Sequence, residues 1–339
     1  MTSTPPSAKP DFSDVVRLIA SARQGAVQAV NVALIDLYWQ VGKTISDKLA
    51  KAEWGEGVVE QLALHIAGTY PGLRGFARPN LYRMRQFFEV YKDQPIVSTL
   101  LRQLSWSHNL AIMGQCKRAD ERQFYLEMSA RENWPFRELE RQIKGALFER
   151  SVLRPAKVAA VLRQLHPAAE SIFKDTYLLE FLDLPADHDE RGLHNGLLGR
   201  FKDFLIELGR DFCFAGSQYP VQVGTRDFAI DLLFFHRGLN CLVAFELKVG
   251  RFEPEYLGKL SFYLEALDRD HRKPHENPAI GVLLCASKDD EVVEYALNRT
   301  LSPAMIAEYQ TQLPDKRLLQ AKLHEFWLLN QPAEGQGDA

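Results

Sequence analysis

The sequence predicts an α+β protein of two domains, with an all-α helical front half and an α/β back half built on a central mixed sheet. The length of 339 residues allows two sizeable cores. Apolar residues recur at helical spacing from Val15 to about Arg154, and after Pro167 helices alternate with apolar strands. We expect a helical domain over residues 15–155 and an α/β domain over residues 170–330.

Charge is distributed unevenly between the two halves. Residues 1–157 carry 22 Lys and Arg against 16 Asp and Glu, whereas the rest of the chain carries 19 against 28. The positive surplus at the front favours a polyanionic partner, although solvated helix faces alone would produce a surplus of this size. We therefore expect the front half to bind DNA, with a protein partner as the alternative.

The cysteines and the first residues of the chain bear on the cellular compartment of the protein. Four cysteines lack C-x-x-C spacing and lie in apolar or helical surroundings, so neither a zinc site nor a disulfide framework is predicted. The start, MTSTPPSAKPDFSD, is a polar tail rather than a signal peptide, and no run of 18 apolar residues follows. We expect a cytoplasmic protein without a membrane segment.

The segment GEGVVEQLALHIAGTYPGLRGFARPNLYRMRQFFEVY is a candidate helix-turn-helix. It predicts one helix, a turn rich in Pro and Gly, and a second helix that opens after Pro79. If the second helix entered a major groove, four arginines would contact phosphates or guanine edges. These are Arg74, Arg78, Arg83 and Arg85. A core helix with buried aromatic residues and solvated arginines explains the pattern equally well.

Nothing in the front half resembles a catalytic set. Ser107 and His108 are adjacent, but a nucleophile and its base need a third group and a suitable turn. A structural histidine is the simpler interpretation.

The back half follows a regular order of elements. It comprises a helix at GLLGRFKDFLIELG, strands at FAIDLLFFH and CLVAFELKV, a helix at PEYLGKLSFYLEALD, a strand at AIGVLLCAS, a helix at DDEVVEYALNR, a strand near AMIAEYQTQLP and a helix at DKRLLQAKLHEFW. Apolar runs of this kind are typical of strands covered on both faces.

Three charges lie inside the two apolar runs that flank the turn RGLN: Asp231, Glu246 and Lys248. A tight hairpin centred between Gly238 and Leu239 places Asp231 opposite Glu246, ~5 Å apart at Cβ. A charge in an apolar strand is unfavourable unless it is paired or binds a metal. Because facing carboxylates repel each other, this register predicts a cation between them.

Lys248 shares a face of its strand with Glu246, ~7 Å away, because side chains alternate along a strand. Proteins usually hold Mg²⁺ with one or two carboxylates, and water and phosphate complete its coordination shell. Mg²⁺ or Mn²⁺ would lower the pKa of a bound water, while Lys248 orients or deprotonates that water and counters the charge on phosphorus. The predicted chemistry is hydrolysis of a phosphodiester. A structural ion pair of Lys248 with one acid is the alternative, and it leaves the other acid unneutralised.

Asp231, fourteen residues, and then Glu246-Leu247-Lys248 resemble the D-x(n)-E-x-K signature of the PD-(D/E)xK nuclease superfamily. Longer stretches resemble the YhcG family within it: FLIELGRDFCFAGSQ, DLLFFHRGLNCLVAFELKVGRFEPEYLGKLSFYLEALD, NPAIGVLLCASKDDEVVEYAL, LSWSHN and FYLEMSARENWPFRELERQI. The resemblance covers about residues 15–328. It implies a restriction-endonuclease-like α/β core with the element order α-β-β-β-α-β, a divalent metal, and a helical N-terminal region for DNA or partner binding.

The resemblance also implies further site residues. Lys259 and Tyr263, one turn apart on the helix after the motif strand, would meet the phosphate. Their spacing alone is equally consistent with a solvated pair. Relatives have an acid near the start of the first helix, where this chain has His194. A helical wheel places His194 within the packed face and Glu207 well off it, so we expect Glu207 to be solvated. His194, or Glu190 if the helix starts early, would then contribute by binding the metal or a phosphate.

The resulting hypothesis is a metal-dependent DNA endonuclease with a nucleic-acid-binding front domain. The alternative is a nuclease scaffold with weakened or absent turnover that acts as a DNA-binding or complex-forming protein, which His194 in place of an acid favours. An RNA-directed nuclease is a further alternative. Because cutting both strands of a duplex requires two active sites, a homodimer is also an open alternative.

Overall fold

The computed structural model describes residues 13–51, 54, 57–94, 97–185 and 187–330. The predicted polar tail therefore lies almost wholly outside the described residues. The chain divides into two compact units, Met1–Glu140 and Arg141–Ala339. The division falls inside a helix, upstream of the boundaries predicted from the sequence.

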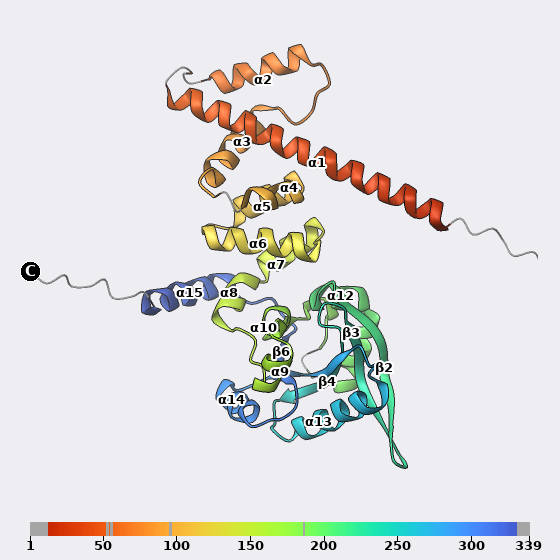
Figure 1. Ribbon diagram of the computed structural model, residues 1–339. Coiled ribbons are helices and arrows are strands. Elements are labelled where there is room, and N and C mark those ends of the chain that lie inside the picture. The colour runs from red at the N-terminus through yellow and green to blue at the C-terminus, as the bar shows by residue number, and fades with distance from the viewer. Residues whose placement is uncertain (1–12, 52–53, 55–56, 95–96, 186, 331–339) are drawn as a thin grey trace, which may run out of the picture. The chain divides into compact units, whose positions relative to one another are not determined.

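The described residues of the first unit form helices, as predicted (Figure 1). They are α1 (Ser13–Ala50), α2 (Val58–Thr69), α3 (Arg78–Tyr91), α4 (Val97–Gln103), α5 (Trp106–Gln115), α6 (Ala119–Glu132) and α7 (Phe136–Lys144), the last of which crosses into the second unit. Residues 70–77 join α2 to α3, a longer connection than the three- or four-residue turn of a DNA-binding helix-turn-helix.

Gly42 lets α1 and α3 cross at close range. A Cβ atom at Gly42 would lie 2.0 Å from the carbonyl oxygen of Met84, so a side chain at this position would clash with the α3 backbone. Nearby, the rings of Trp39 and Phe87 meet edge to face with centroids 5.7 Å apart. This crossing fixes α3, which carries three of the four candidate DNA-binding arginines.

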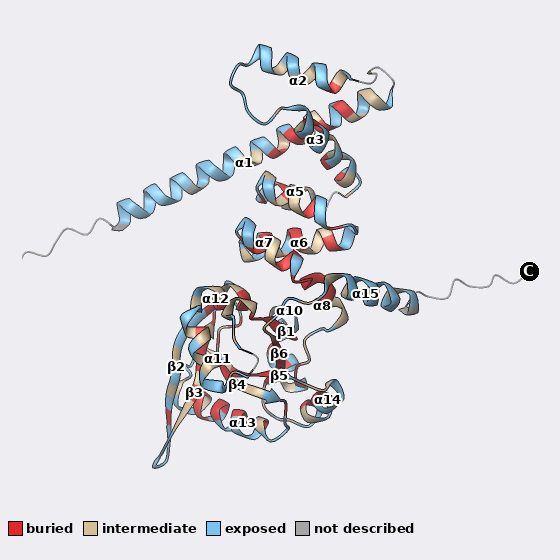
Figure 2. Ribbon diagram, turned by 180° about the vertical axis from the view of Figure 1, so that it is seen from behind, coloured by how far each residue is buried: buried red, intermediate tan, exposed pale blue. Residues whose placement is uncertain are grey.

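The first half of α1 is exposed (Figure 2). Large apolar side chains lie along it, among them Val15, Leu18, Ile19 and Val27. Among the described helices, α1 is the one that is long and apolar enough over Asp14–Ala50 to cross a membrane. Core helices of soluble proteins and signal sequences share this composition, so the expectation of no membrane segment stays a prediction.

The second unit combines one sheet with helices. Its helices are α8 (Leu147–Leu153), α9 (Ala160–Leu165), α10 (Ala169–Ile172), η1 (Glu180–Leu182), α11 (Glu190–Gly199), α12 (Phe201–Leu208), α13 (Tyr256–Ala266), η2 (Leu267–His271), α14 (Asp290–Asn298) and α15 (Lys316–Asn330). Its strands are β1 (Thr176–Leu178), β2 (Phe212–Val223), β3 (Arg226–His236), β4 (Cys241–Arg251), β5 (Asn277–Ser287) and β6 (Ala304–Gln310).

The strands form a single mixed sheet in the order β1-β6-β5-β4-β3-β2. β4, β5, β6 and β1 run parallel, whereas β2 and β4 are both antiparallel to β3. The predicted α/β unit with a central mixed sheet is confirmed.

Helices cover both faces of this sheet. Leu193 of α11 and Phe204 of α12 pack in one apolar cluster with Leu232 of β3. Tyr263 of α13 packs in a second cluster with Leu233. Leu232 and Leu233 are consecutive in a strand and therefore point to opposite faces. The motif strands β3 and β4 are thus held between α11 and α12 on one side and α13 on the other.

Two strands were not expected from apolar runs, because neither is apolar throughout. β1 has three residues. β2 forms the edge of the sheet, is exposed over most of its length, and contains Gly216 and Pro220. Proline is tolerated on an edge strand because its missing N–H would face solvent. A register shift between Phe214 and Gly216 further obscures the alternation.

We expect Gly42→Ala to destabilise the first unit by about 1–3 kcal/mol, because the added methyl must displace the α3 backbone. Gly25→Ala is the matched control: it lies on the same helix, and apart from its chain neighbours and its own helix backbone no described atom lies within 4 Å of its Cβ position. Since Ala favours a helix over Gly, the control should stabilise by about 0.5–1 kcal/mol. Chemical denaturation of the full chain measures both, and equal effects of the two variants would contradict the close crossing.

Candidate active site

Asp231 and Glu246 lie where the pairing between β3 and β4 ends. The β3–β4 ladder runs from His236–Cys241 to Leu232–Phe245, which is the predicted register, and the next residues along the two strands are Asp231 and Glu246. Beyond this point β3 continues beside β2, while β4 continues beside β5. The two acids therefore lie at a fork between strands that diverge.

Glu246 is buried and only half satisfied. Its side chain is 1% exposed; Oε1 accepts a hydrogen bond from Lys259 Nζ at 2.5 Å and lies 3.3 Å from Lys248 Nζ. Oε2 is buried as well and accepts no hydrogen bond from the described residues. Burial, and then the charge of Asp231, raise the pKa of Glu246 in spite of the two lysines. A cation at Oε2 would relieve both effects.

Asp231 is held by two donors from different strands. Its Oδ2 accepts a hydrogen bond from the backbone N–H of Leu247 at 2.8 Å, and its Oδ1 accepts one from Gln218 Nε2 at 3.1 Å. Gln218 belongs to β2 and was not predicted as a site residue, because no apolar run marks the position of β2 in the sequence. Only the pairing of β2 with β3 would have indicated this residue.

Lys248 joins the first helix to the motif strand. Its Nζ donates to Glu190 Oε1 at 3.1 Å in addition to its contact with Glu246, and its side chain is 14% exposed. Burial alone lowers the pKa of Lys248, but the bonds to Glu190 and Glu246 outweigh burial and raise that pKa. Lys248 is therefore protonated at neutral pH, which suits it to orient a water or counter negative charge.

Lys259 and Tyr263 of α13 differ in their accessibility. Lys259 is half exposed, binds Glu246, and lies with Nζ 5.4 Å from the ring centroid of Tyr263. Tyr263 is 2% exposed, and its hydroxyl donates to the carbonyl oxygen of Ala229 at 2.8 Å. Tyr263 thus supports Lys259 and the β3 backbone, whereas Lys259 has an ammonium group that a phosphate would reach.

The first-helix candidates line one pocket with Asp231. The pocket has a volume of about 460 Å³. Its lining residues are Glu190, Arg191, His194, Asn195, Gln218, Asp231 and Leu247. α11 begins at Glu190, whose carboxylate is bound to Lys248, and His194 has a buried Nε2 that bonds to no described residue. The structure therefore brings both candidates next to Asp231.

The prediction that Glu207 is solvated is wrong. Glu207 is fully buried, and both carboxylate oxygens accept two hydrogen bonds each, at 2.9–3.1 Å. The donors are Arg141, Gln142, Lys174 and the backbone N–H of Leu178. The helical wheel failed because the helix breaks at Arg200, so α11 and α12 do not share one continuous face.

The charge of Glu207 is stabilised by cations. Burial raises its pKa, but Lys174, Arg141 and Arg150 together lower that pKa to about 2. Burial lowers the pKa of Lys174, and the like charges of Arg150 and Arg141 add to this effect. Since three cations face a single carboxylate, Glu207 stays ionised and serves as a structural anchor rather than a metal ligand.

The acid pair fits a divalent metal ion. Among the described residues no group of three or more His, Cys, Asp and Glu side chains lies close enough to hold a metal. Mg²⁺, however, is commonly held by one or two carboxylates, with water and substrate phosphate completing the shell. Glu246 Oε2, which accepts no hydrogen bond from a described residue, and the nearby carboxylate of Asp231 are oxygen donors of the kind that such an ion binds.

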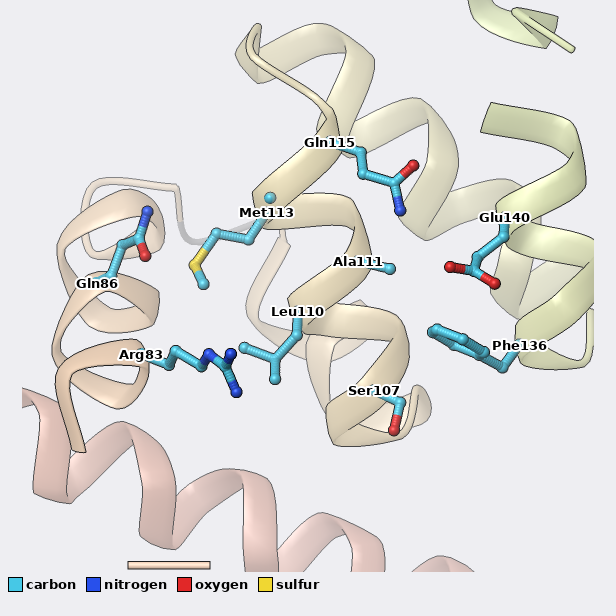
Figure 3. Close-up of a pocket in the computed structure, with 10 residues that line it drawn as sticks. Arg83, Gln86, Ser107, Leu110, Ala111, Met113, Gln115, Phe136 and Glu140 are labelled. Atoms are coloured by element: carbon cyan, nitrogen blue, oxygen red, sulfur yellow. The ribbon is translucent and has the colours of Figure 1, made fainter. Parts of the chain in front are cut away.

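The four candidate DNA-binding arginines lie in or just before α3. Arg78 lies 3.9 Å from Glu60, and Arg85 donates to Glu89 at 2.7 Å. Arg74 and Arg83 are exposed and have no acidic partner among the described residues. Arg83 also lines a hollow of about 430 Å³ with Ser107, Phe136 and Glu140, which Figure 3 shows.

His108 is a structural residue, as expected. Its Nδ1 lies 2.7 Å from Ser105 Oγ and its Nε2 lies 3.0 Å from the carbonyl oxygen of Trp134. Both ring nitrogens are therefore engaged within the helical unit, and His108 has none left to activate Ser107.

Comparison with known proteins identifies the family of this chain. A family model described as "YhcG PDDEXK nuclease domain" matches residues 170–324, and one described as "DUF1016 N-terminal domain" matches residues 14–150. A protein of Escherichia coli (strain K12) named "Putative nuclease YhcG" is 32% identical over 346 residues, covering 91% of this chain and 92% of that protein. The mixed sheet and the family match define a nuclease domain of the PD-(D/E)xK class. The chain belongs to the YhcG family.

Two solved structures are similar to part of the chain. One is titled "crystal structure of a repair endonuclease from Pyrococcus abyssi"; it is 14% identical with a TM-score of 0.25 and covers 38% of this chain and 49% of its own. The other, "Structure of EndoMS in apo form", is 16% identical with a TM-score of 0.24 and covers 38% and 48%. Each match spans about half of the solved chain.

We expect Glu207→Gln to lower the free energy of unfolding of the second unit by about 3–5 kcal/mol at pH 7, because it leaves buried cations without their counter-charge. The folded pKa of about 2 lies below the ordinary value of 4.5, so this stabilisation is present above about pH 5 and is lost as pH falls toward 2. Denaturant titrations at several pH values should therefore show the difference from the wild type shrinking with acidification.

Asp203→Asn is the control for this variant. Asp203 lies on the same helix and pairs at the surface with Arg200. An exposed pair contributes about 1 kcal/mol or less. A Glu207→Gln effect as small as the control, or one that does not change with pH, would contradict the buried network.

Proposed function

We propose that this protein is a Mg²⁺- or Mn²⁺-dependent DNA endonuclease of the cytoplasm, with the metal held by Asp231 and Glu246. The observation that carries the proposal is the buried Oε2 of Glu246, which bonds to none of the described residues, at a fork that also holds Asp231. A half-satisfied buried carboxylate beside a second acid is unfavourable unless a cation joins it. The family's nuclease domain supports the same assignment.

The surrounding residues divide the work of hydrolysis. The metal, when bound, lowers the pKa of a water and neutralises charge on the phosphate. Lys248, held between Glu190 and Glu246, positions its ammonium group to orient the attacking water. Lys259 projects a half-exposed ammonium group that would bind the phosphate and stabilise the charge that develops there. Tyr263 positions Lys259 and the β3 backbone next to Asp231.

We expect Asp231→Asn to reduce Mn²⁺ affinity and to abolish plasmid nicking, because it removes the charge of one ligand. Calorimetric titration of Mn²⁺ and a plasmid-nicking assay on the same samples measure both effects. Asp227→Asn is the matched control, since Asp227 is an exposed acid on the same strand. Unchanged Mn²⁺ binding by Asp231→Asn would refute the proposed metal site.

The products and substrates of the same assay test the remaining parts of the proposal. Single-strand nicks are expected of one active site, whereas double-strand cuts would indicate two copies acting on one duplex. Cleavage of RNA but not DNA would replace the DNA assignment. Both outcomes leave the metal site in place.

A second candidate function is a nuclease scaffold that binds DNA or a protein without turnover. The observation that favours it is His194, a non-acidic residue that lines the pocket at the first-helix position. Metal binding without nicking on supercoiled, linear or single-stranded DNA would support this function. In that case His194→Glu should restore nicking if the missing acid is the cause.

For the helical unit we propose that Arg74, Arg78, Arg83 and Arg85 contact DNA phosphates, with Arg74 and Arg83 contributing most because no described acid neutralises them. In the full chain without metal, Arg74→Ala combined with Arg83→Ala should weaken DNA binding. It should also reduce the slope of log affinity against log salt by about 2, one unit for each phosphate contact.

Arg118→Ala is the control for this pair, because Arg118 is exposed in the same unit but is already bound to Asp120 at 3.0 Å. Its salt slope should match that of the wild type. If the double variant behaves like the control, the arginines do not contact phosphate, and a protein partner becomes the better assignment for this unit.

A further inference from the structure

Gln218 has a backbone conformation that is unusual for its place in the fold. Five non-glycine residues among those described have a positive φ. Four of them lie at helix ends or in a turn: Asn133, Ala146, Asp183 and Asn240. Gln218, with φ 46°, is the one that lies inside a strand. Such a conformation is disfavoured for a residue with a Cβ atom.

This residue lies opposite Asp231. The β2–β3 ladder pairs Ser217 with Leu232 and Tyr219 with Ile230, and it passes over Gln218. The side-chain amide of Gln218 instead donates to Asp231 Oδ1 at 3.1 Å, and both residues line the same pocket. The left-handed backbone thus coincides with the point where a side chain of β2 reaches the acid pair.

Local stability does not explain the conformation. The Gln218 side chain is exposed, and its hydrogen bond to the half-buried Asp231 adds little to folding because water competes for the exposed amide. Gly would adopt the same φ without strain. Backbone strain that local contacts do not offset is found preferentially at functional sites.

We propose that Gln218 is a positioning residue that fixes the carboxylate of Asp231 in its metal-binding orientation. With Leu247 N–H on Oδ2 and the Gln218 amide on Oδ1, both oxygens have a donor, which restricts rotation of the carboxylate about its Cβ–Cγ bond. Each oxygen of an ionised carboxylate has two acceptor positions, so one remains for the metal. The inference rests on the proposed metal site.

The test uses two variants of Gln218 whose residue types tolerate the positive φ at this position. Gln218→Gly removes the amide and relieves the positive φ. Gln218→Asn keeps an amide and a residue type that tolerates this φ, but it is one methylene too short to reach Asp231. We expect both to lower Mn²⁺ affinity by about 10- to 100-fold, the usual effect of losing a partner of a metal ligand. Neither should lower the melting temperature, and nicking should recover at raised Mn²⁺.

Asn240→Gly is the matched control. Asn240 also has a positive φ, of 51°, and its amide also donates a hydrogen bond, at 2.6 Å to the carbonyl oxygen of His275. It lies in the turn at the other end of the β3–β4 hairpin. Its Mn²⁺ affinity should equal that of the wild type, so an equal loss in the control would overturn the inference.

Asp231→Asn separates failure of the inference from failure of the metal site. If Asp231→Asn loses Mn²⁺ binding while both Gln218 variants bind as the wild type does, the positioning role is refuted and the metal site stands. If Asp231→Asn binds Mn²⁺ unchanged, the metal site and the positioning role are refuted together. Loss in all three variants, with the control unchanged, supports both.

Discussion

The burial of Glu246 next to Asp231 is the constraint on which the rest of the second unit depends. Two carboxylates at a fork of strands repel each other, and burial adds the loss of hydration. The surrounding elements each supply part of the compensation: Lys259 comes from α13, Lys248 from β4 and a backbone N–H from Leu247. One oxygen of Glu246 nevertheless accepts no hydrogen bond from any residue that the structure describes.

A comparison of Glu246 with Glu207 shows why the unsatisfied oxygen of Glu246 indicates a function. Both are buried in the same unit, yet among the described residues Glu207 has two donors on each oxygen and Glu246 has none on Oε2. Their pKa values accordingly shift in opposite directions, down for Glu207 and up for Glu246. A fully satisfied carboxylate anchors structure, whereas a half-satisfied one is suited to bind a cation.

The sequence predicted the parts of the fold and site that depend on regular periodicity. Apolar runs around a tight turn were enough to align Asp231 with Glu246, since strand side chains alternate with a period of two. Wherever the backbone is irregular, the periodicity misleads. The break at Arg200 turned Glu207 from its expected solvated face into the interior. The exposed edge strand with its register shift hid Gln218 altogether.

The most direct test of the metal site is anomalous diffraction from crystals of this protein grown with Mn²⁺. The account predicts an anomalous peak at the fork, within about 2.3 Å of both Asp231 and Glu246 Oε2, at the bond lengths typical of oxygen ligands to divalent cations. An anomalous peak only at another place would contradict this prediction. So would the absence of a peak at the fork at saturating Mn²⁺, with Lys248 and Lys259 still paired with Glu246.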